Sequence, residues 1–597
     1  MIKIPTIFSH GMVINKKARI WGWAKPGSQL TLGFMGKTYK ASADANGRFE
    51  AEIISDEYGG PYTLTIGGKI IHDVYVGHVW LCGGQSNMEQ PISRTRPLLD
   101  EYISENPHIR AFQVEKGFAF DCPAADVNGS WQTATGNFLE EIFAVPYFFA
   151  QALGKNTPIG LINIAAGGTP AEAWLPEEII CSFPGFYERL EPYKTPGYAE
   201  KIENENQEVA KKWHEYLDSK DFGLVEGWHS PHYNHDHWEK TMLLDQTDKP
   251  GYGVTWYRKD IFLPEGFNTS AYLSLGRVID SVTIYVNGKI VLDIGYQYPP
   301  CRGAIPDGLL KSGNNTIAIR AIGSKSKHHF IPGKKYELTY PTGKIDLQGP
   351  WHWRKGCRAH ISPTQPGVWL YNVPTCTYNY MLAPILGYSV DGAIWYQGES
   401  NTPNPEGYKE IFKAFVQHLR EHFGKIPVIF TQLANYIDPN SNGENWAKLR
   451  NQQLMCLEIP NTAMAVTIDC GEYNDLHPQD KKTVGERLAL CAKSLAYDEQ
   501  IPYSGPIAKK AIQQDEEIII TFNHSEGLWA KNGRPMVEII DTNGASHHLP
   551  AEIKDKNLSV QYVNAKQIRF GLMDCPTIVL YNAHGLPASP FTLDCSY

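Results

Sequence analysis

Ser86 is the residue of this chain best suited to act as a nucleophile. It lies in the segment 84–88, GQSNM, shortly after the apolar run 78–81, HVWL, which is typical of a buried strand. Side chains at the carboxyl end of such a strand face the crevice where open α/β sheets bind ligands. The segment lacks the second glycine of the G-x-S-x-G turn, because Met88 stands two residues after Ser86. This departure argues against the α/β-hydrolase fold and for another serine-hydrolase scaffold.

His477 is the candidate base for this serine. Ester hydrolysis by serine needs a base, a group that orients the base, and donors that hold the oxyanion. His477 precedes an expected helix from about 481 to 496, and Asp475 lies two residues before it. A nearby carboxylate holds the tautomer of an imidazole and stabilises its protonated form. With 20 histidines in the chain, a polar residue near a helix start is the alternative, and Asp475 favours the base.

Two more loops carry groups suited to an active site. Gly167 and Gly168 follow one expected strand, and adjacent glycines allow a backbone N–H to point into a crevice. Gln397 and Glu399 follow another expected strand, and they offer an amide donor and a carboxylate. Each loop alone is an ordinary turn. Four such loops in one chain predict a common site.

The elements that must position these loops indicate an α/β fold interrupted by β-rich blocks. Apolar strands at 79–82, 160–164, 393–396 and 428–431 alternate with helical stretches such as 138–153. Short strands separated by turn residues occupy the two ends of the chain and the stretch 245–345. We expect an N-terminal β-sandwich (1–75), a first core part (76–215), an inserted β-sandwich with linkers (216–375), a second core part (376–502) and a C-terminal β-rich domain (503–597).

Composition excludes several classes of protein. A chain of 597 residues is expected to form several domains. Its net charge of −9 gives no global field for nucleic acid or an anionic membrane, and no run of about 18 apolar residues predicts a membrane span. Residues 1–25 lack the order of a signal peptide, and 11 cysteines without a CxxC pair favour a reducing compartment. We expect a cytoplasmic protein, or a periplasmic or secreted one if a leader was removed.

A cluster of histidines raises the question of a metal site. The cluster consists of His229, His232, His235 and His237. Tryptophans and a proline surround it, and a β-type run follows, as expected of a linker that enters the inserted sandwich. We therefore expect surface or linker histidines and no metal.

Taken together, the motifs resemble the sialate O-acetylesterase family of carbohydrate acetylesterases, within the SGNH (GDSL-like) hydrolase superfamily. The resemblance rests on segments 84–88, 167–169 with Trp174, 395–401, and 475–478 with Gly485 and Arg487; it extends to 8–23 and 585–591. It implies a three-layer α/β/α SGNH-hydrolase core without metal or organic cofactor. It also implies that the inserted sandwich is similar to the sugar-binding jelly rolls of glycoside hydrolases.

The resemblance assigns a role to each loop. Ser86 would attack an acetyl carbonyl, and His477 would serve as base and then as acid to the leaving sugar hydroxyl. The backbone N–H groups of Ser86 and Gly168, with the side chain of Gln397, would hold the oxyanion. Water would then release acetate from the acetyl-serine intermediate.

The third member of the triad is open between two carboxylates. SGNH hydrolases commonly carry an aspartate three residues before the histidine, but this chain has Asn474 there. Asp475 is the expected member, and Glu399 is the alternative because some related acetylesterases use the glutamate of this loop. Residues expected to bind substrate are Gln85, Asn87, Trp174 and Asn401.

The expected substrate is an O-acetylated sugar or glycan, with no nucleic-acid or membrane partner. An acetyl-xylan or acetyl-xyloglucan esterase is the alternative within the same chemistry. A carbohydrate-binding protein with a decayed hydrolase core is a further alternative, and it predicts a lost catalytic residue. Because Ser86, Gly168, Gln397, Glu399 and His477 are all present, the enzyme is favoured.

Overall fold

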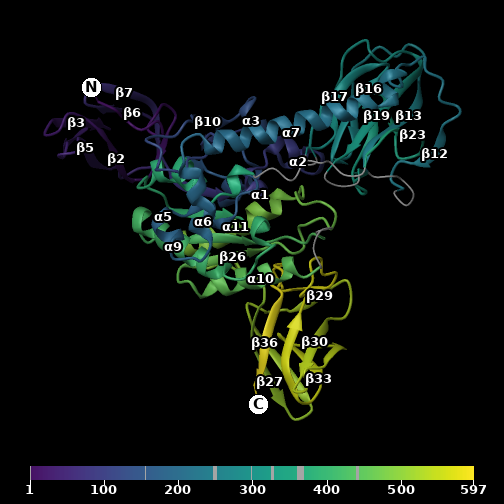
Figure 1. Cartoon of the computed structure of the whole chain (residues 1–597). Helices are drawn as coiled ribbons and strands as arrows, with labels where there is room; N and C mark the ends of the chain where they lie inside the picture. Colours follow the sequence, from purple (N-terminus) through teal and green to yellow (C-terminus); the bar gives the residue numbers. More distant parts are fainter. Residues whose placement is uncertain are drawn as a thin grey trace. The chain divides into compact units, whose positions relative to one another are not determined.

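The chain divides into two units in the computed structural model, Met1–Tyr198 with Trp369–Tyr597, and Ala199–Val368 (Figure 1). The structure describes residues 2–154, 156–245, 252–296, 299–324, 328–359, 369–437 and 443–596. Among the described residues, no helix carries an apolar stretch of the length that crossing a bilayer requires.

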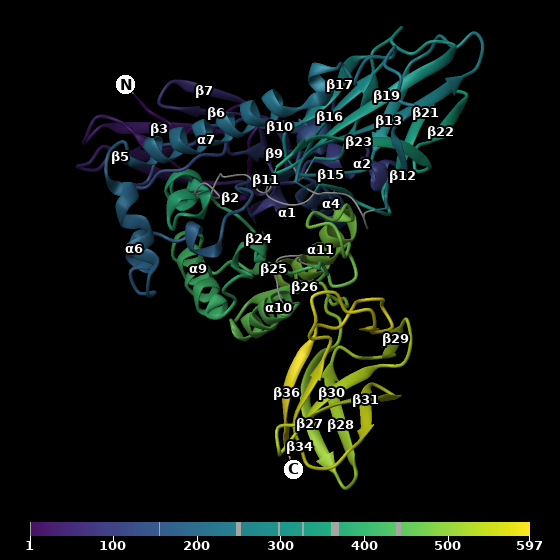
Figure 2. The ribbon, with the colours of Figure 1, turned by 45° about the vertical axis from the view of Figure 1, so that its right-hand side comes forward.

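A seven-stranded sheet forms the centre of the first unit. Its order is β10-β9-β11-β8-β24-β25-β26, and every neighbouring pair except β10 with β9 is parallel. Figure 2 shows β24, β25 and β26 side by side. The strands are β8 (His78–Gly84), β9 (Asn106–Gln113), β10 (Trp131–Ala134), β11 (Ile159–Asn163), β24 (Gly392–Tyr396), β25 (Val428–Gln432) and β26 (Thr462–Val466). β8, β11, β24 and β25 are buried along their whole length, as expected for parallel strands covered on both faces.

The order of strands reverses between β8 and β24. After β8 the chain builds β9 and β11 on one side, and after β24 it builds β25 and β26 on the other. Open α/β sheets bind ligands outside the carboxyl ends of the strands at such a reversal. The two strands approach closely there: a Cβ on Gly84, whose φ is +140°, would lie 2.1 Å from the carbonyl oxygen of Tyr396. Only glycine fits this position.

Helices cover both faces of this sheet. The ring of Trp80 lies against Phe149, and the ring of Trp395 lies against Phe415. Trp80 pairs with Gly392, three residues before Trp395, so the two tryptophans project from opposite faces. One face therefore carries α4 (Ala144–Leu153) and α11 (Lys481–Tyr497), which pack on each other; the other carries α9 (Tyr408–Phe423), which packs on α10 (Asn445–Met455). The result is three layers, α/β/α.

Mainly antiparallel β modules, each with one parallel strand pair (β1 with β7, and β27 with β36), occupy both ends of the first unit. At the N-terminus, sheet β1-β7-β6-β3-β4 accompanies the pair β2-β5, and at the C-terminus sheet β31-β30-β34-β36-β27-β28-β33-β32 accompanies β29-β35. The N-terminal strands are β1 (Val13–Ile14), β2 (Lys17–Trp23), β3 (Gln29–Phe34), β4 (Lys37–Ser42), β5 (Arg48–Ile54), β6 (Gly59–Ile66) and β7 (Lys69–Val76). The C-terminal strands are β27 (Ile507–Gln514), β28 (Glu517–Asn523), β29 (Trp529–Lys531), β30 (Met536–Asp541), β31 (Ser546–Pro550), β32 (Glu552–Lys554), β33 (Asn557–Gln561), β34 (Ala565–Phe570), β35 (Val579–Tyr581) and β36 (Phe591–Ser596).

The second unit contains all but the first residue of the long helix α7 (Tyr198–Lys220) and two main antiparallel sheets; Figure 2 labels α7 and strands of both sheets. The sheet orders are β12-β23-β13-β19-β16-β17 and β18-β14-β21-β22. Their strands are β12 (Glu239–Met242), β13 (Gly253–Leu263), β14 (Ala271–Leu275), β16 (Ser281–Val286), β17 (Lys289–Ile294), β18 (Arg302–Ile305), β19 (Gly313–Gly323), β21 (Tyr336–Tyr340), β22 (Gly343–Asp346) and β23 (Pro350–Arg358). An apolar core that includes Leu273, Ile284, Ile319 and Leu338 lies within this unit.

The expectation of a mixed α/β chain with β-rich parts is confirmed, but the helix expected over 138–153 is broken. The structure has α3 (Phe138–Glu141) and α4, separated by extended backbone at Ile142 and Phe143. A continuous helix would need an N–H at Pro146 to bond the carbonyl of Ile142, and proline has none. The N–H of Ile92 bonds that carbonyl instead.

The histidines at 229–237 lie in the connection between α8 (Phe222–Val225) and β12, as expected of linker residues, but not all of them are at the surface. His235 is only 6% exposed, and its Nδ1 accepts a hydrogen bond from Nε of Arg258 at 3.2 Å. His229 lies with its ring stacked on Tyr285. These rings pack against the sheet of the second unit. The five domain limits expected from the sequence stay predictions.

Candidate active site

Ser86 and His477, which are 391 residues apart in the chain, meet at the carboxyl end of β8. Ser86 is the first residue of the short helix α1 (Ser86–Glu89), and it is half-buried between the buried side chains of Gln85 and Asn87. His477 is buried on the loop between β26 and α11. The hydroxyl of Ser86 lies 2.8 Å from Nε2 of His477. This is the distance at which an imidazole can take the proton of a serine.

The two carboxylates proposed as third member have different partners. Asp475 is buried on the loop of His477, and its Oδ1 accepts the backbone N–H of His477 at 2.8 Å. Glu399 follows β24, and its Oε1 accepts a hydrogen bond from the side-chain amide of Asn87. Its other oxygen is buried without a hydrogen-bond donor among the described residues. Burial raises the pKa of Glu399 to about 7, which the hydrogen bond from Asn87 partly offsets.

The glycine turn after β11 presents backbone to the site. Gly168 has φ +78° and is half-buried, and its N–H bonds no acceptor in the described part of the chain. The neighbouring N–H of Gly167 donates to Oε2 of Glu89 at 2.5 Å, which ties this turn to α1. Lys116 forms an ion pair with the same carboxylate. The turn therefore holds one backbone donor without a protein acceptor among the described residues, at the residue after Gly167, whose added Cβ would lie 3.4 Å from Cβ of Ser86.

The amide of Gln397 is already committed to protein acceptors. Its Nε2 donates to Oε1 of Gln85, the carbonyl of Thr169 and Oδ1 of Asn401, at 3.2, 3.2 and 2.7 Å. Its oxygen accepts from the hydroxyl of Tyr408 at 2.9 Å. Gln397 is 1% exposed. In this arrangement it braces the loops, and its expected donation to an oxyanion stays a prediction.

Three residues expected to bind substrate are likewise bound within the protein. Oε1 of Gln85 accepts the backbone N–H groups of Gly398 and Ser400, so Gln85 fastens the β24 loop to the nucleophile turn. Asn401 donates to Glu172 at 3.0 Å. Trp174 is fully buried, and its ring lies edge-on against Trp395 at 5.7 Å. Their contacts support the scaffold of the site, and direct contact with substrate stays a prediction.

Asn87, the fourth of these residues, joins two buried charges. Its Nδ2 donates to Glu399 and to the carbonyl of Leu476, the latter at 3.0 Å, and its Oδ1 accepts from Nζ of Lys481. Lys481 is fully buried at the first turn of α11. Burial lowers the pKa of Lys481 to about 8, against the attraction of Glu399 and Asp475. Lys481 is not part of any motif in the sequence. A lysine at the start of a helix is the one signal available, because cations are disfavoured there.

Trp369 is a second residue of the site that the sequence motifs do not include. Its indole N–H donates to the carbonyl of Gly167 at 3.3 Å, and its ring edge lies 2.8 Å from where a Cβ of Gly168 would be. Its side chain is 54% exposed, which leaves an aromatic face at the glycine turn. No motif in the sequence links Trp369 to a turn that lies 202 residues earlier.

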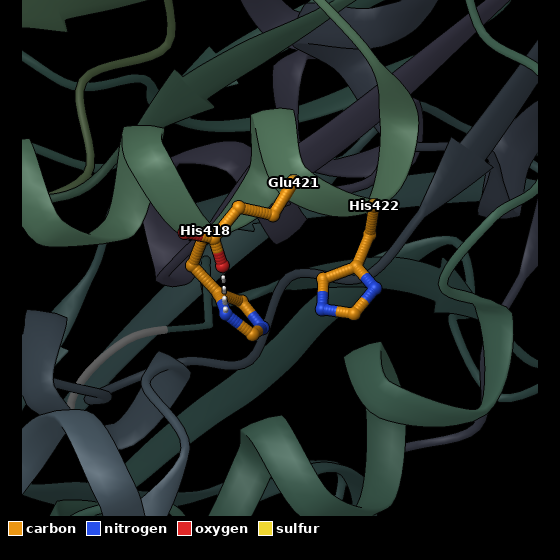
Figure 3. A group of neighbouring side chains, drawn as sticks. All are labelled: His418, Glu421 and His422. Carbon is orange, nitrogen blue, oxygen red and sulfur yellow. Dashed lines mark ion pairs between the residues drawn. The ribbon is translucent and has the colours of Figure 1, made fainter.

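A possible metal-binding group occurs elsewhere, on α9. His418, Glu421 and His422 have ligand atoms within 4.8 Å of one another (Figure 3). Their spacing of three and four residues places them on one helix face. Nε2 of His418 is bound to the hydroxyl of Tyr378 at 3.0 Å, and Glu421 is exposed. The group makes no contact with Ser86 or His477 among the described residues, so we assign it no part in the site.

Known proteins similar to this chain include carbohydrate acetylesterases. Residues 76–210 and 365–493 match the family model described as "Carbohydrate esterase, sialic acid-specific acetylesterase". The sialate O-acetylesterase of Rattus norvegicus is 26% identical over 250 residues, 36% of this chain and 46% of that protein. The sialate O-acetylesterase of Mus musculus is 33% identical over 154 residues, 22% of this chain and 28% of that protein. The matches thus span less than half the length of these relatives.

A solved structure shares the fold over the whole length. The crystal structure of a novel carbohydrate acetylesterase from Xanthomonas citri aligns with a TM-score of 0.65, covers 100% of both chains and is 23% identical. The likeness extends to the β modules as well as the α/β core.

Proposed function

We propose that this chain is a serine esterase that removes O-acetyl groups from carbohydrates; its segments 76–210 and 365–493 match the family model of sialic acid-specific acetylesterases, which supports this proposal. The observation that carries the proposal is the 2.8 Å contact between the Ser86 hydroxyl and Nε2 of His477. The names of the curated relatives support sialic acid as the sugar.

The reaction proceeds in two halves. His477 takes the proton of Ser86 as the hydroxyl oxygen attacks the acetyl carbonyl, and the protonated imidazole then delivers that proton to the departing sugar oxygen. This step leaves an acetyl ester on Ser86. In the second half His477 takes a proton from water, hydroxide attacks the acetyl-serine, and acetate leaves as Ser86 regains its proton. The backbone N–H groups of Ser86 and Gly168 hold the oxyanion in both halves.

Asp475 is our proposed orienting carboxylate. Its bond to the backbone N–H of His477 supports this role, since it places the carboxylate on the loop that carries the imidazole. The partner of Glu399 is Asn87, which supports a different role for that residue.

We further propose that residues 76–215 and 376–502 form an SGNH-type core, split by a jelly-roll-like sandwich at 216–375. The three layers around the parallel sheet support this core, and the two antiparallel sheets of the second unit support the inserted sandwich. The flanking modules are then 1–75 and 503–597.

The test is acetate release from 9-O-acetylated sialic acid and, in parallel, from acetylated xylan and acetylated xyloglucan, with Ser86→Ala as control. We expect release from sialic acid that falls at least 10³-fold in the variant, because the nucleophile is lost. If acetate is released preferentially from either plant polymer, the proposed mechanism stands and the proposed substrate changes to that polymer. Release from no substrate above the variant's background contradicts the proposal and favours a carbohydrate-binding protein.

A further inference from the structure

We propose that Asn87 is a positioning residue that fixes the nucleophile turn to the base loop, and that the buried pair Glu399 and Lys481 sets its orientation. This inference rests on the proposed function, because it assigns these three residues a part in the same reaction. The inference requires no contact between these three residues and the substrate.

The amide of Asn87 has only one orientation that satisfies its neighbours. Its NH2 group faces two acceptors, the carboxylate of Glu399 and the carbonyl of Leu476, while its oxygen faces the ammonium of Lys481. Rotating the amide by half a turn would set oxygen against oxygen and hydrogen against hydrogen. The charged groups on both sides therefore lock the side chain by charge-assisted hydrogen bonds.

Because of its position in the chain, Asn87 connects the loop of the nucleophile to the loop of the base. Asn87 directly follows Ser86, and Leu476 directly precedes His477. The 3.0 Å bond from Asn87 to Leu476 thus joins the residue beside the nucleophile to the residue beside the base. It joins the same two loops as the 2.8 Å contact between Ser86 and His477, so we expect a change in one distance to alter the other. Displacements of about 1 Å in a catalytic contact can cost about 10²-fold in rate.

Burying the charges of Lys481 and Glu399 costs free energy of folding, and orienting Asn87 gives a reason for that cost. Lys481 is fully buried at the N-terminal end of α11, where the helix dipole disfavours a cation, and Glu399 is 7% exposed. Within the described residues the two make no direct ion pair, and Asn87 lies between them. The remaining charges around Lys481 are Asp475, Glu472 and Asp480. Removing one charge of such a set leaves the other buried without compensation.

Two substitutions at Asn87 and one at Lys481 test the link. Asn87→Asp keeps the shape and the contact with Lys481 but presents oxygen to Glu399 and Leu476; Asn87→Ala removes every bond. Lys481→Met removes the ammonium. We expect each variant to lower kcat on p-nitrophenyl acetate about 10- to 100-fold with KM within twofold of wild type. We expect an equal loss in the rate at which a fluorophosphonate labels Ser86.

Lys482→Met is the matched control, since Lys482 is the next residue and pairs with Glu486 outside the network. It should retain wild-type rates. Full labelling rates in Asn87→Asp and Lys481→Met would overturn the inference. If Lys481→Met fails to fold, as judged by circular dichroism, the comparison of Asn87→Asp with wild type decides. Labelling that is lost only in Ser86→Ala and slowed at Asn87 supports the link even when no acetylated sugar is hydrolysed, so its outcome is separate from that of the proposed function.

Discussion

Asp475 and Glu399 lie in the same site but have different hydrogen-bond partners, and their substitutions should differ accordingly. We expect Asp475→Asn to lower kcat at least 10²-fold, because an uncharged side chain no longer stabilises the imidazolium of His477. Glu399→Gln should lower kcat no more than about 10-fold, since Glu399 affects the reaction only through the position of Asn87. Steady-state rates on p-nitrophenyl acetate measure both. The opposite ranking would make Glu399 the orienting carboxylate.

Glu399 also makes stability depend on pH. Its pKa in the folded protein, about 7, lies above the ordinary value of 4.5, so the folded state holds this proton more tightly than the unfolded state. Its contribution to stability is fully present below pH 4.5 and is lost as the pH rises through 7. We expect the wild type to lose up to about 3 kcal/mol relative to Glu399→Gln over this range, measured by urea unfolding. Parallel pH curves for the two proteins would contradict this.

The residues that sequence reasoning could identify were those in short motifs after strands. The residue types and positions of Ser86 and His477 predict a nucleophile and its base, and the structure brings the two together. Lys481 and Trp369 were missed because their importance depends on burial and on contacts with residues far away in the chain. Gln397 lies in a loop that the sequence does indicate. Its hydrogen bonds to three protein acceptors, however, follow only from the three-dimensional structure.

At the scale of elements, the contact between β8 and β24 is the tightest constraint on the site. A Cβ at Gly84 would meet the backbone of Tyr396 at 2.1 Å, and backbone cannot move aside as a side chain can. We expect Gly84→Ala to destabilise the protein by about 3 kcal/mol or more and to abolish esterase activity, measured by thermal unfolding and acetate release.

Gly533→Ala is the control for this substitution. Gly533 has a similar φ of +129°, but the nearest atom to its added Cβ lies 4.0 Å away. It should show the backbone strain alone, about 1 to 2 kcal/mol, with activity retained. An equal loss of stability in both variants would show that conformation, and not the approach of the two strands, requires glycine at 84.

Elements with a clear hydrophobic pattern were predictable from the sequence, and elements without one were not. The runs at 393–396 and 428–431 became β24 and β25 because they are apolar throughout. The 23-residue helix α7 was missed because only Trp213 and Leu217 are buried on it. Ion pairs four residues apart, such as Lys212 with Glu208, stabilise its polar surface instead. Such pairs leave no apolar stripe to detect.

At the scale of the whole molecule, the two units have separate apolar cores. Leu273 is fully buried in the core of the second unit, and Ile394 is fully buried in β24 of the first. We expect at least two calorimetric transitions. Leu273→Ala should lower the free energy of unfolding of the second unit by about 2–5 kcal/mol. It should leave the esterase rate within twofold of wild type. Ile394→Ala should lower a different transition and reduce activity.

One transition shifted equally by both substitutions would show that the units unfold together. In that case the second unit contributes to the stability of the unit that carries the site. The paired design separates these outcomes because Leu273 lies in the second unit and Ile394 lies in the first.

The order of strands in the central sheet has a consequence for synthesis on the ribosome. β8 lies between β11 and β24, yet roughly 300 residues separate its end at Gly84 from the start of β24 at Gly392. At about 5–20 residues per second, one edge of this apolar strand stays without its neighbour for about 15–60 s. An uncovered apolar edge of this kind invites aggregation. Nascent chains that stop before residue 392 should therefore depend on chaperones. The surroundings of the nucleophile at the end of β8 are complete only after the second half of the sheet has emerged.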